Sequence, residues 1–261
     1  MIYAKKSLGQ NYLVDINIIK KIVSLRQICD KNVLEIGPGK GALTEEILKN
    51  NPKSLILIEK DDLLFNELKL KYKYNPKIII FNEDILNFKV EEKIKKKSII
   101  FGNLPYNISS QILVKLIKFK KWPPNYSDLI LMFQKEMAER VIGNFGSPKY
   151  GRLSILRNYR LKISDKFNIS SNCFFPKPKV ESTILHLKPK KVDPLKIKKI
   201  ENLEKVTNLL FSGKRKMINK NIKKIFNEKK INMIKNLDLK LRPSNLKPEK
   251  YYEITKLFEK K

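Results

Sequence analysis

The segment at residues 102–109, GNLPYNIS, combines groups that could activate a weakly nucleophilic amine. The exocyclic amine of adenine delocalises its lone pair into the ring, so an enzyme must favour the geometry in which the nitrogen becomes tetrahedral. The side-chain oxygen of Asn103 and the backbone carbonyl of Leu104 could accept the two amine hydrogens in that geometry. Pro105 stiffens the turn, and Tyr106 offers a face on which a base can stack. We predict that this tetrapeptide is the catalytic loop, although it could also be an ordinary turn.

A second candidate site is the glycine-rich segment at residues 33–44, VLEIGPGKGALT. A buried strand is expected to end at Gly37, where glycines let the backbone approach a ligand closely. Glu59 ends the next predicted strand, and its carboxylate could accept both ribose hydroxyls of an adenosyl group. The spacing G-x-G-x-G differs from the G-x-G-x-x-G of dinucleotide enzymes and looks like the loop of S-adenosylmethionine methyltransferases. Asp84, after the third predicted strand, could accept a hydrogen bond from the cofactor's adenine, although such an acid is often a helix N-cap.

These segments need a scaffold that brings them to one place. Short apolar runs alternate with amphipathic stretches, which predicts strands at 31–37, 54–59, 77–81, 98–101 and 128–133 and helices from 42, over 62–72 and over 109–119. Continuous apolar strands separated by helices are typical of a parallel sheet with helices on both faces. We therefore predict an α/β fold with a Rossmann-like sheet, of the kind found in S-adenosylmethionine methyltransferases.

The chain changes character near residue 190. The segment at 188–194, KPKKVDP, is polar and contains two prolines, which indicates a boundary. Beyond it, apolar residues fall at helical spacing, and a proline precedes a predicted helix at 249–258. We predict a catalytic domain over residues 1–190 and a small, basic, all-α domain over residues 191–261.

The charge of the chain favours a polyanionic partner. Lysine and arginine number 56 against 26 acidic residues, a net charge of +30, and the excess is densest after residue 190. An AT-rich genome would also enrich lysine. Two cysteines and one histidine are too few for a Cys/His metal site, and His186 is interpreted as a strand residue on a polar face. Without a signal peptide or a membrane-spanning run, a soluble cytoplasmic protein is expected.

The chain resembles, end to end, the adenine dimethyltransferases of small-subunit ribosomal RNA. The matching stretches are SLGQNYLVD, VLEIGPGKGALT, IEKD, FGNLPYNISS, MFQKEMAERV, YGRLS, FFPKPKVEST, FSGKRKMINKNIK and RPSNLKPEKYYEI. The resemblance implies roles at matching positions: Asn11 and Leu13 would close over the cofactor, Gly37 would contact its methionine part, Glu59 its ribose, Asp84 its adenine, and Asn103 the cofactor or the target amine. Phe174 would stack on the extruded base opposite Tyr106, although it could instead be a core residue.

The resemblance also implies the substrate. The family transfers four methyl groups, two to each of two adjacent adenosines in a hairpin loop near the 3′ end of small-subunit RNA, during ribosome assembly. The basic helical domain would grip the RNA backbone through Lys214, Arg215 and Lys216. Apart from the resemblance, we expect a monomer that needs no metal ion and no membrane. Tyr12 stands where the family more often has Phe, and the sequence KRKMI at 214–218 departs from the common pattern.

Three alternatives remain open from the sequence. One is a related methyltransferase of large-subunit RNA, of the type that confers macrolide resistance. Another is a DNA adenine methyltransferase, which would need a target-recognition region that the sequence does not show. The third is an assembly factor that binds RNA without catalysis, and the intact residues 103–106 and 37–41 argue against it.

Overall fold

The computed structural model describes residues 10–191 and 197–260, which form two compact units. Within these residues, the first unit covers the chain up to Lys115, Lys121–Ala138 and Ile163–Pro189. The second covers Leu116–Lys120, Glu139–Lys162 and the chain from Lys190 onward. Residues 7–9 of the matching stretch SLGQNYLVD lie outside the described part of the chain.

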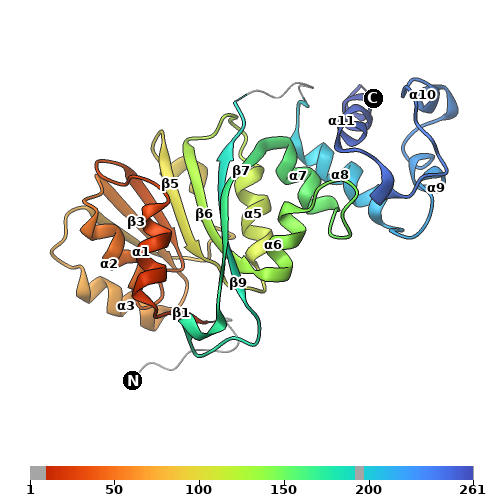
Figure 1. The fold of residues 1–261 in the computed structure, drawn as a ribbon. Coiled ribbons are helices and arrows are strands. Elements are labelled where there is room, and N and C mark those ends of the chain that lie inside the picture. Colours follow the sequence, from red (N-terminus) through yellow and green to blue (C-terminus); the bar gives the residue numbers. More distant parts are fainter. Residues whose placement is uncertain (1–9, 192–196, 261) are drawn as a thin grey trace. The chain divides into compact units, whose positions relative to one another are not determined.

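A mixed sheet forms the centre of the first unit (Figure 1). In the described chain it has seven strands in the order β4-β3-β2-β5-β6-β9-β7. The strands are β2 (Asn32–Ile36), β3 (Ser54–Glu59), β4 (Ile78–Asn82), β5 (Ser98–Asn103), β6 (Tyr126–Gln134), β7 (Leu161–Ile169) and β9 (Ser182–Pro189). Strands β4 to β6 are parallel, as predicted, but β9 pairs antiparallel with β6. The apolar alternation that marks β9 in the sequence carries no information on its direction, so the prediction of a wholly parallel sheet was incomplete.

Helices α1 (Ile16–Ser24) and α2 (Ala42–Lys49) share one hydrophobic core with the sheet and lie together in Figure 1. Helix α1 begins where the side chain of Asp15 accepts hydrogen bonds from the first free backbone N–H groups. Its buried residues follow helical spacing, at Ile19, Ile22 and Val23, and each contributes about 1.5–3 kcal/mol by burial. The other helices of the described chain are α3 (Asp62–Lys71), α4 (Val90–Lys93), α5 (Ser109–Ile117), α6 (Lys135–Ile142), α7 (Arg152–Arg160), α8 (Ile200–Phe211), α9 (Asn219–Ile222), α10 (Glu228–Asn232) and α11 (Pro248–Phe258).

The strand register brings three predicted site segments to the same edge of the sheet. Ile36 at the end of β2 pairs with Ile58 of β3 on one side and with Gly102 of β5 on the other. The residues that follow these positions, Gly37, Glu59 and Asn103, are therefore neighbours at the carboxyl edge.

The second unit is helical after Lys190 within the described chain, and helices α7, α8 and α11 contact one another. Two earlier segments, Leu116–Lys120 and Glu139–Lys162, also belong to the second unit, because their residues form contacts inside that unit. Tyr150 donates to the carbonyl of Leu246 at 2.9 Å, and the rings of Tyr159 and Tyr252 lie 4.9 Å apart. Arg160 donates to the carbonyls of Ile117 and Phe119. The unit thus includes segments before residue 191, and the predicted domain division at residue 190 stays a prediction.

Within residues 10–191 and 197–260, no helix combines the length and apolarity needed to cross a membrane. The same residues contain no group of three or more His, Cys, Asp or Glu side chains arranged to hold a metal ion. Cys29 and Cys173 are free thiols.

Candidate active site

The glycine turn after β2 adopts a backbone that other residues rarely adopt. Gly37 and Gly39 have φ values of +65° and +58°, in the left-handed region. A Cβ atom on Gly39 would lie 3.1 Å from the ring of Tyr12, and one on Gly37 would lie 3.8 Å from the backbone oxygen of Asn103. The turn therefore lies directly beside the predicted catalytic loop, and a ligand can approach its backbone.

Glu59 lies at the end of β3 with its carboxylate fixed by the backbone. One oxygen accepts a hydrogen bond from the Gly39 N–H at 3.1 Å, and the other accepts from the Asp61 N–H at 2.9 Å. Burial raises the pKa of Glu59, and these hydrogen bonds act against the rise. The backbone of Lys60 also hydrogen-bonds to this carboxylate, and its remaining lone pairs can accept hydroxyl groups in a fixed direction.

Glu35 lies beneath the glycine turn and is 1% exposed. Thr44, in the first turn of α2, donates its hydroxyl to the Glu35 carboxyl at 2.6 Å. Burial raises the pKa of Glu35 to about 7; the Thr44 hydrogen bond opposes the rise and the charge of Glu59 adds to it. The side chain ties β2 to α2 and so supports the turn between them.

Asp84 follows β4 and combines both roles considered for it. Its carboxylate accepts a hydrogen bond from the Leu86 N–H at 2.8 Å, which closes a local turn, and it pairs with Lys60 at 2.8 Å. The hydrogen bond from Lys60 holds the pKa of Asp84 below its usual range. The ionised carboxylate of Asp84 is thus a hydrogen-bond acceptor just after β4, the strand next to the one that ends at Glu59.

The predicted catalytic loop leaves β5 at Asn103, whose side-chain amide donates to the backbone oxygen of Asn11 at 2.9 Å. This bond uses the nitrogen and sets the orientation of the amide. Leu104 is 1% exposed and folds back against Gly102, where a Cβ would lie 2.7 Å from it. Tyr106 shares a hydrogen bond of 2.8 Å with the hydroxyl of Ser182, and burial raises the pKa of its phenol.

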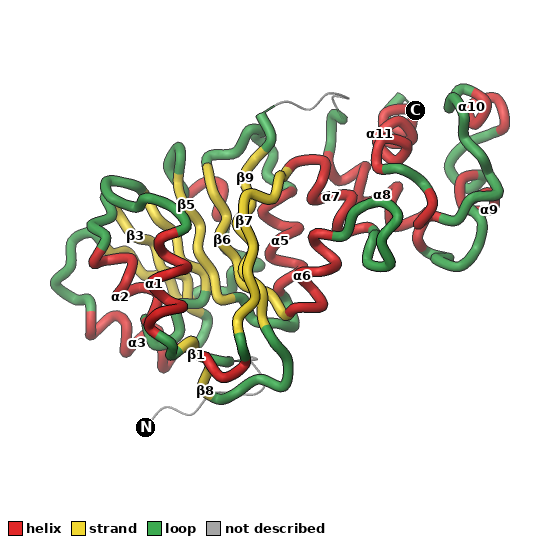
Figure 2. The backbone as a smooth tube through the Cα atoms, in the orientation of Figure 1, coloured by secondary structure: helices red, strands yellow, loops and turns green. Residues whose placement is uncertain are grey.

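The N-terminal segment at residues 10–13 crosses the site and is held on both sides. The Tyr12 hydroxyl donates to Gln10 at 2.8 Å, and Gln10 donates to the Asp61 carboxylate at 3.1 Å. On the other side, Asn103 bonds to the backbone of Asn11. Strand β1 (Tyr12–Leu13) also pairs antiparallel with β8 (Phe174–Phe175), and Figure 2 shows the two strands side by side.

These groups surround one cavity of about 460 Å³. The residues predicted from the sequence that line it are Asn11, Leu13, Gly37, Glu59, Asp84, Asn103, Leu104, Pro105 and Tyr106. The wall also contains Glu35, Glu83 and Lys60. Several carboxyl groups thus face one cavity in a chain of net charge +30, which suits a ligand that carries positive charge.

The remaining predicted site residues do not line this cavity. Phe174 is 3% exposed and belongs to the core that includes Leu13. Lys214, Arg215 and Lys216 are exposed in the turn between α8 and α9, within the second unit. None of these four residues is among those that line the cavity.

Sequence reasoning missed residues that act through hydrogen bonds over long separations. Thr44 and Lys60 fix the acids of the cavity, and Gln10 and Asp61 hold the N-terminal segment. Asp61 also caps α3 by accepting from the Leu63 and Leu64 N–H groups. This role could have been predicted from the sequence, because an acid just before an amphipathic run is typical of a helix N-cap. Thr44, Lys60 and Gln10 lie in stretches that match the family, but nothing in their local spacing indicated these contacts.

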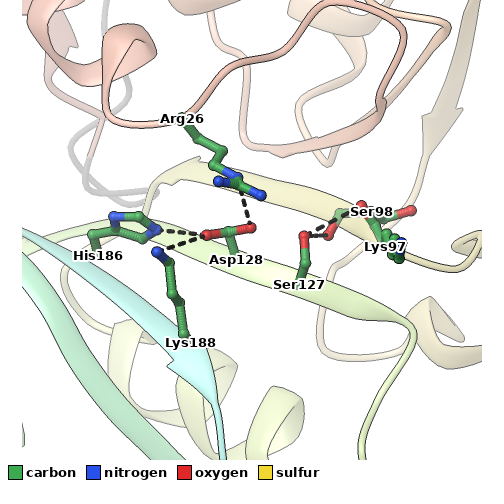
Figure 3. Close-up of polar contacts among 7 residues, drawn as sticks. All are labelled: Arg26, Lys97, Ser98, Ser127, Asp128, His186 and Lys188. Carbon is green, nitrogen blue, oxygen red and sulfur yellow. Dashed lines mark hydrogen bonds and ion pairs between the residues drawn. The ribbon is translucent and has the colours of Figure 1, made fainter.

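A second group of charged side chains surrounds a buried carboxylate, and none of them lines the cavity (Figure 3). Asp128 is 1% exposed; it lies 2.8 Å from His186, 3.3 Å from Arg26 and 3.9 Å from Lys188. Asp128 pairs with Ile99 at the beginning of β5, so the group occupies the edge of the sheet opposite the catalytic loop. His186 lies in β9, so the predicted strand position is confirmed, but its side chain is 3% exposed and faces Asp128 rather than solvent. The contacts of Asp128 join β6, β9 and the segment that follows α1, and they indicate a structural role.

Comparison of the sequence with known families and proteins gives one consistent match. A family model described as "Ribosomal RNA adenine dimethylase" matches residues 1–260. A Pelagibacter ubique protein named "Ribosomal RNA small subunit methyltransferase A" is 44% identical over 98% of this chain and 97% of its own. A Malacoplasma penetrans protein of the same name is 40% identical over 97% of this chain and 91% of its own.

Solved structures show the same fold. A dimethyladenosine transferase from Plasmodium falciparum matches 93% of this chain and 95% of its own, with a TM-score of 0.78 and 28% identity. The 23S rRNA methyltransferase ErmE matches 95% of this chain and 99% of its own, with a TM-score of 0.70 and 22% identity. The second likeness is one of fold alone.

Proposed function

The chain belongs to the ribosomal RNA adenine dimethylase family, and we propose which RNA it methylates and how. It is an enzyme that uses S-adenosylmethionine as methyl donor. We propose that it transfers methyl groups to the N6 amines of two adjacent adenosines in a hairpin loop near the 3′ end of small-subunit ribosomal RNA, during ribosome assembly. The observation that carries this proposal is that one cavity unites the glycine turn, Glu59 and the loop at residues 103–106.

The residues of the cavity fit S-adenosylmethionine. Glu59 has lone pairs left for the two ribose hydroxyls, and ionised Asp84 can accept from the adenine amine. The open backbone at Gly37 admits the methionine part, while Asn11 and Leu13 cover it. When bound, the cofactor supplies a methyl group on a positively charged sulfur, and this charge suits a wall rich in carboxyl groups.

The catalytic loop orients the target amine. Because the Asn103 nitrogen is occupied by the Asn11 carbonyl, the Asn103 side-chain oxygen is left as an acceptor for one amine hydrogen. The Leu104 carbonyl accepts the other, so the nitrogen lone pair leaves conjugation with the ring and can attack. Tyr106, anchored through Ser182, presents its ring to the extruded base. The proposed stacking by Phe174 requires that its buried ring become accessible when RNA binds.

The substrate is tested by offering labelled S-adenosylmethionine with two RNAs in parallel. One is the small ribosomal subunit lacking these methyl groups, and the other is protein-free large-subunit RNA. We expect label in dimethyladenosine of the small subunit only. Label confined to large-subunit RNA would establish the macrolide-resistance type instead, and binding without any label would establish a non-catalytic assembly factor.

The role of Asn103 is tested by Asn103→Ala. Removing one positioned hydrogen-bonding group in an active site costs about 10²–10³ in turnover, so we expect a loss of that size with RNA affinity retained. Asn66→Ala, an exposed asparagine of α3, is the matched control. Turnover of Asn103→Ala equal to that of the control would refute the assigned role.

We further propose that the protein works in the cytoplasm as a monomer and without a metal ion. The methyl donor carries its own positive charge, so the chemistry has no need of a Lewis acid. We also propose that residues 191–261 bind RNA and that the exposed Lys214, Arg215 and Lys216 contact phosphates.

A further inference from the structure

We propose that residues 175–181, the rim loop, form a second RNA contact beside the cavity, in which Phe175 stacks on the unpaired nucleobase next to the target adenosine. Lys177 and Lys179 bind the phosphates on either side of that base. This proposal rests on the proposed function and adds a residue that positions the substrate.

Both ends of the rim loop are attached to the wall of the cavity. At its beginning, Phe175 pairs across the β1–β8 ladder with Tyr12, which lines the cavity. Just after its end, Ser182 shares a hydrogen bond of 2.8 Å with Tyr106, which also lines the cavity. The loop is thus held between the N-terminal segment and the catalytic loop, and it borders the place where a base enters.

Strand geometry directs the two adjacent phenylalanines to opposite faces. Successive side chains of a strand alternate, so Phe174 is 3% exposed in the core while Phe175 is 68% exposed. Val14 follows β1, the strand that pairs with β8, and donates its N–H to the Cys173 carbonyl. Its side chain is 57% exposed. An exposed aromatic ring with an aliphatic neighbour offers a flat apolar surface next to the active site.

The charges of the rim loop favour a nucleic acid as the occupant. Lys177 and Lys179 are exposed, and the acid at its end, Glu181, is paired with Lys135 at 2.7 Å. An aromatic face flanked by cations is the arrangement that binds single-stranded nucleic acid, by stacking and phosphate contacts. Extruding a target base also leaves its neighbour without a stacking partner, and Phe175 can replace that partner.

The first test compares Phe175→Leu with Phe175→Trp on small subunits that lack the methyl groups. Stacking of one base on an aromatic side chain corresponds to about a 5- to 150-fold change in affinity. We expect Phe175→Leu to raise KM for the subunit within this range, with kcat and S-adenosylmethionine affinity little changed. Phe175→Trp keeps an aromatic ring, so its KM should stay close to that of the wild type. Tyr74→Leu is the matched control, because Tyr74 is 88% exposed beside Lys73 and precedes β4 at the opposite edge of the sheet. An unchanged KM for Phe175→Leu overturns the proposal.

The second test places the photo-crosslinking residue p-benzoyl-phenylalanine at position 175 of the full chain, with position 74 as control. We expect a crosslink to a nucleotide adjacent to a methylated adenosine. A crosslink to a ribosomal protein, to a distant nucleotide, or to nothing overturns the proposal. Because the unsubstituted protein's methylation of the subunit is measured separately, failure of the proposed function is distinguishable from failure of the Phe175 contact.

Discussion

The buried carboxyl group beneath the glycine turn makes stability depend on pH in a way that one substitution should remove. Glu35 is 1% exposed, and its pKa is raised to about 7 from an ordinary 4.5, first by burial. Replacement by glutamine keeps the shape and the acceptor for the Thr44 hydroxyl but removes the proton that titrates. We expect Glu35→Gln to unfold less readily than the wild type above about pH 5.

The magnitude follows from the shift of the pKa. Between about pH 4.5 and 7 the folded state keeps a proton on Glu35 that the unfolded chain releases, so the free energy of unfolding falls as the pH rises. Each pKa unit corresponds to about 1.4 kcal/mol, and the shift therefore corresponds to about 3 kcal/mol in total. Below pH 4.5 this stabilisation is fully present, and above pH 7 it is fully lost.

Urea denaturation of both proteins at intervals from pH 5 to 8.5 measures the effect. The advantage of Glu35→Gln should grow by about 1.4 kcal/mol per pH unit up to about pH 7 and then level off. Other titrating groups are common to both proteins and cancel in the difference. Glu67→Gln, on the exposed face of α3, controls for the loss of one carboxylate. A difference that stays constant with pH would show that Glu35 does not titrate with a raised pKa in the folded protein.

Two further predictions concern charge. Asp128→Asn removes the buried carboxylate that His186 and the partly exposed Arg26 contact, so we expect a loss of about 1.5–3 kcal/mol in urea denaturation at pH 7. Burial opposes ionisation of Asp128, but the His186 hydrogen bond and the Arg26 charge hold its pKa low. The stabilisation from these contacts is therefore lost as the pH falls through the lowered pKa of Asp128. A loss under about 1 kcal/mol would contradict the structural role assigned to Asp128. Replacing Lys214, Arg215 and Lys216 with alanine should weaken RNA binding and reduce the slope of log affinity against log salt by about one for each phosphate that these side chains bind. An unchanged slope would remove them from the RNA interface.

Several parts of the site could be predicted from the sequence, because they depend on the chemistry of neighbouring residues. The glycines at 37 and 39 indicated a turn because few other residues adopt positive φ, and the structure has them at +65° and +58°. The apolar run ending in an acid predicted β3 as Ser54–Glu59, because burial of a strand on both faces leaves a continuous hydrophobic run. The parallel order of such strands then placed Glu59 and Asn103 at one edge of the predicted sheet.

Which of two neighbouring phenylalanines faces solvent depends on the folded chain. Nothing in the sequence shows which of Phe174 and Phe175 is buried. The pairing of β8 with β1 buries Phe174 and exposes Phe175. Burial of His186 likewise depends on folding, since its partner Asp128 lies 58 positions earlier in the chain. Strand pairing and ion pairing over such separations follow from the order of strands in the sheet. No local spacing of residue types encodes that order, which is why these contacts appear only when the chain is folded.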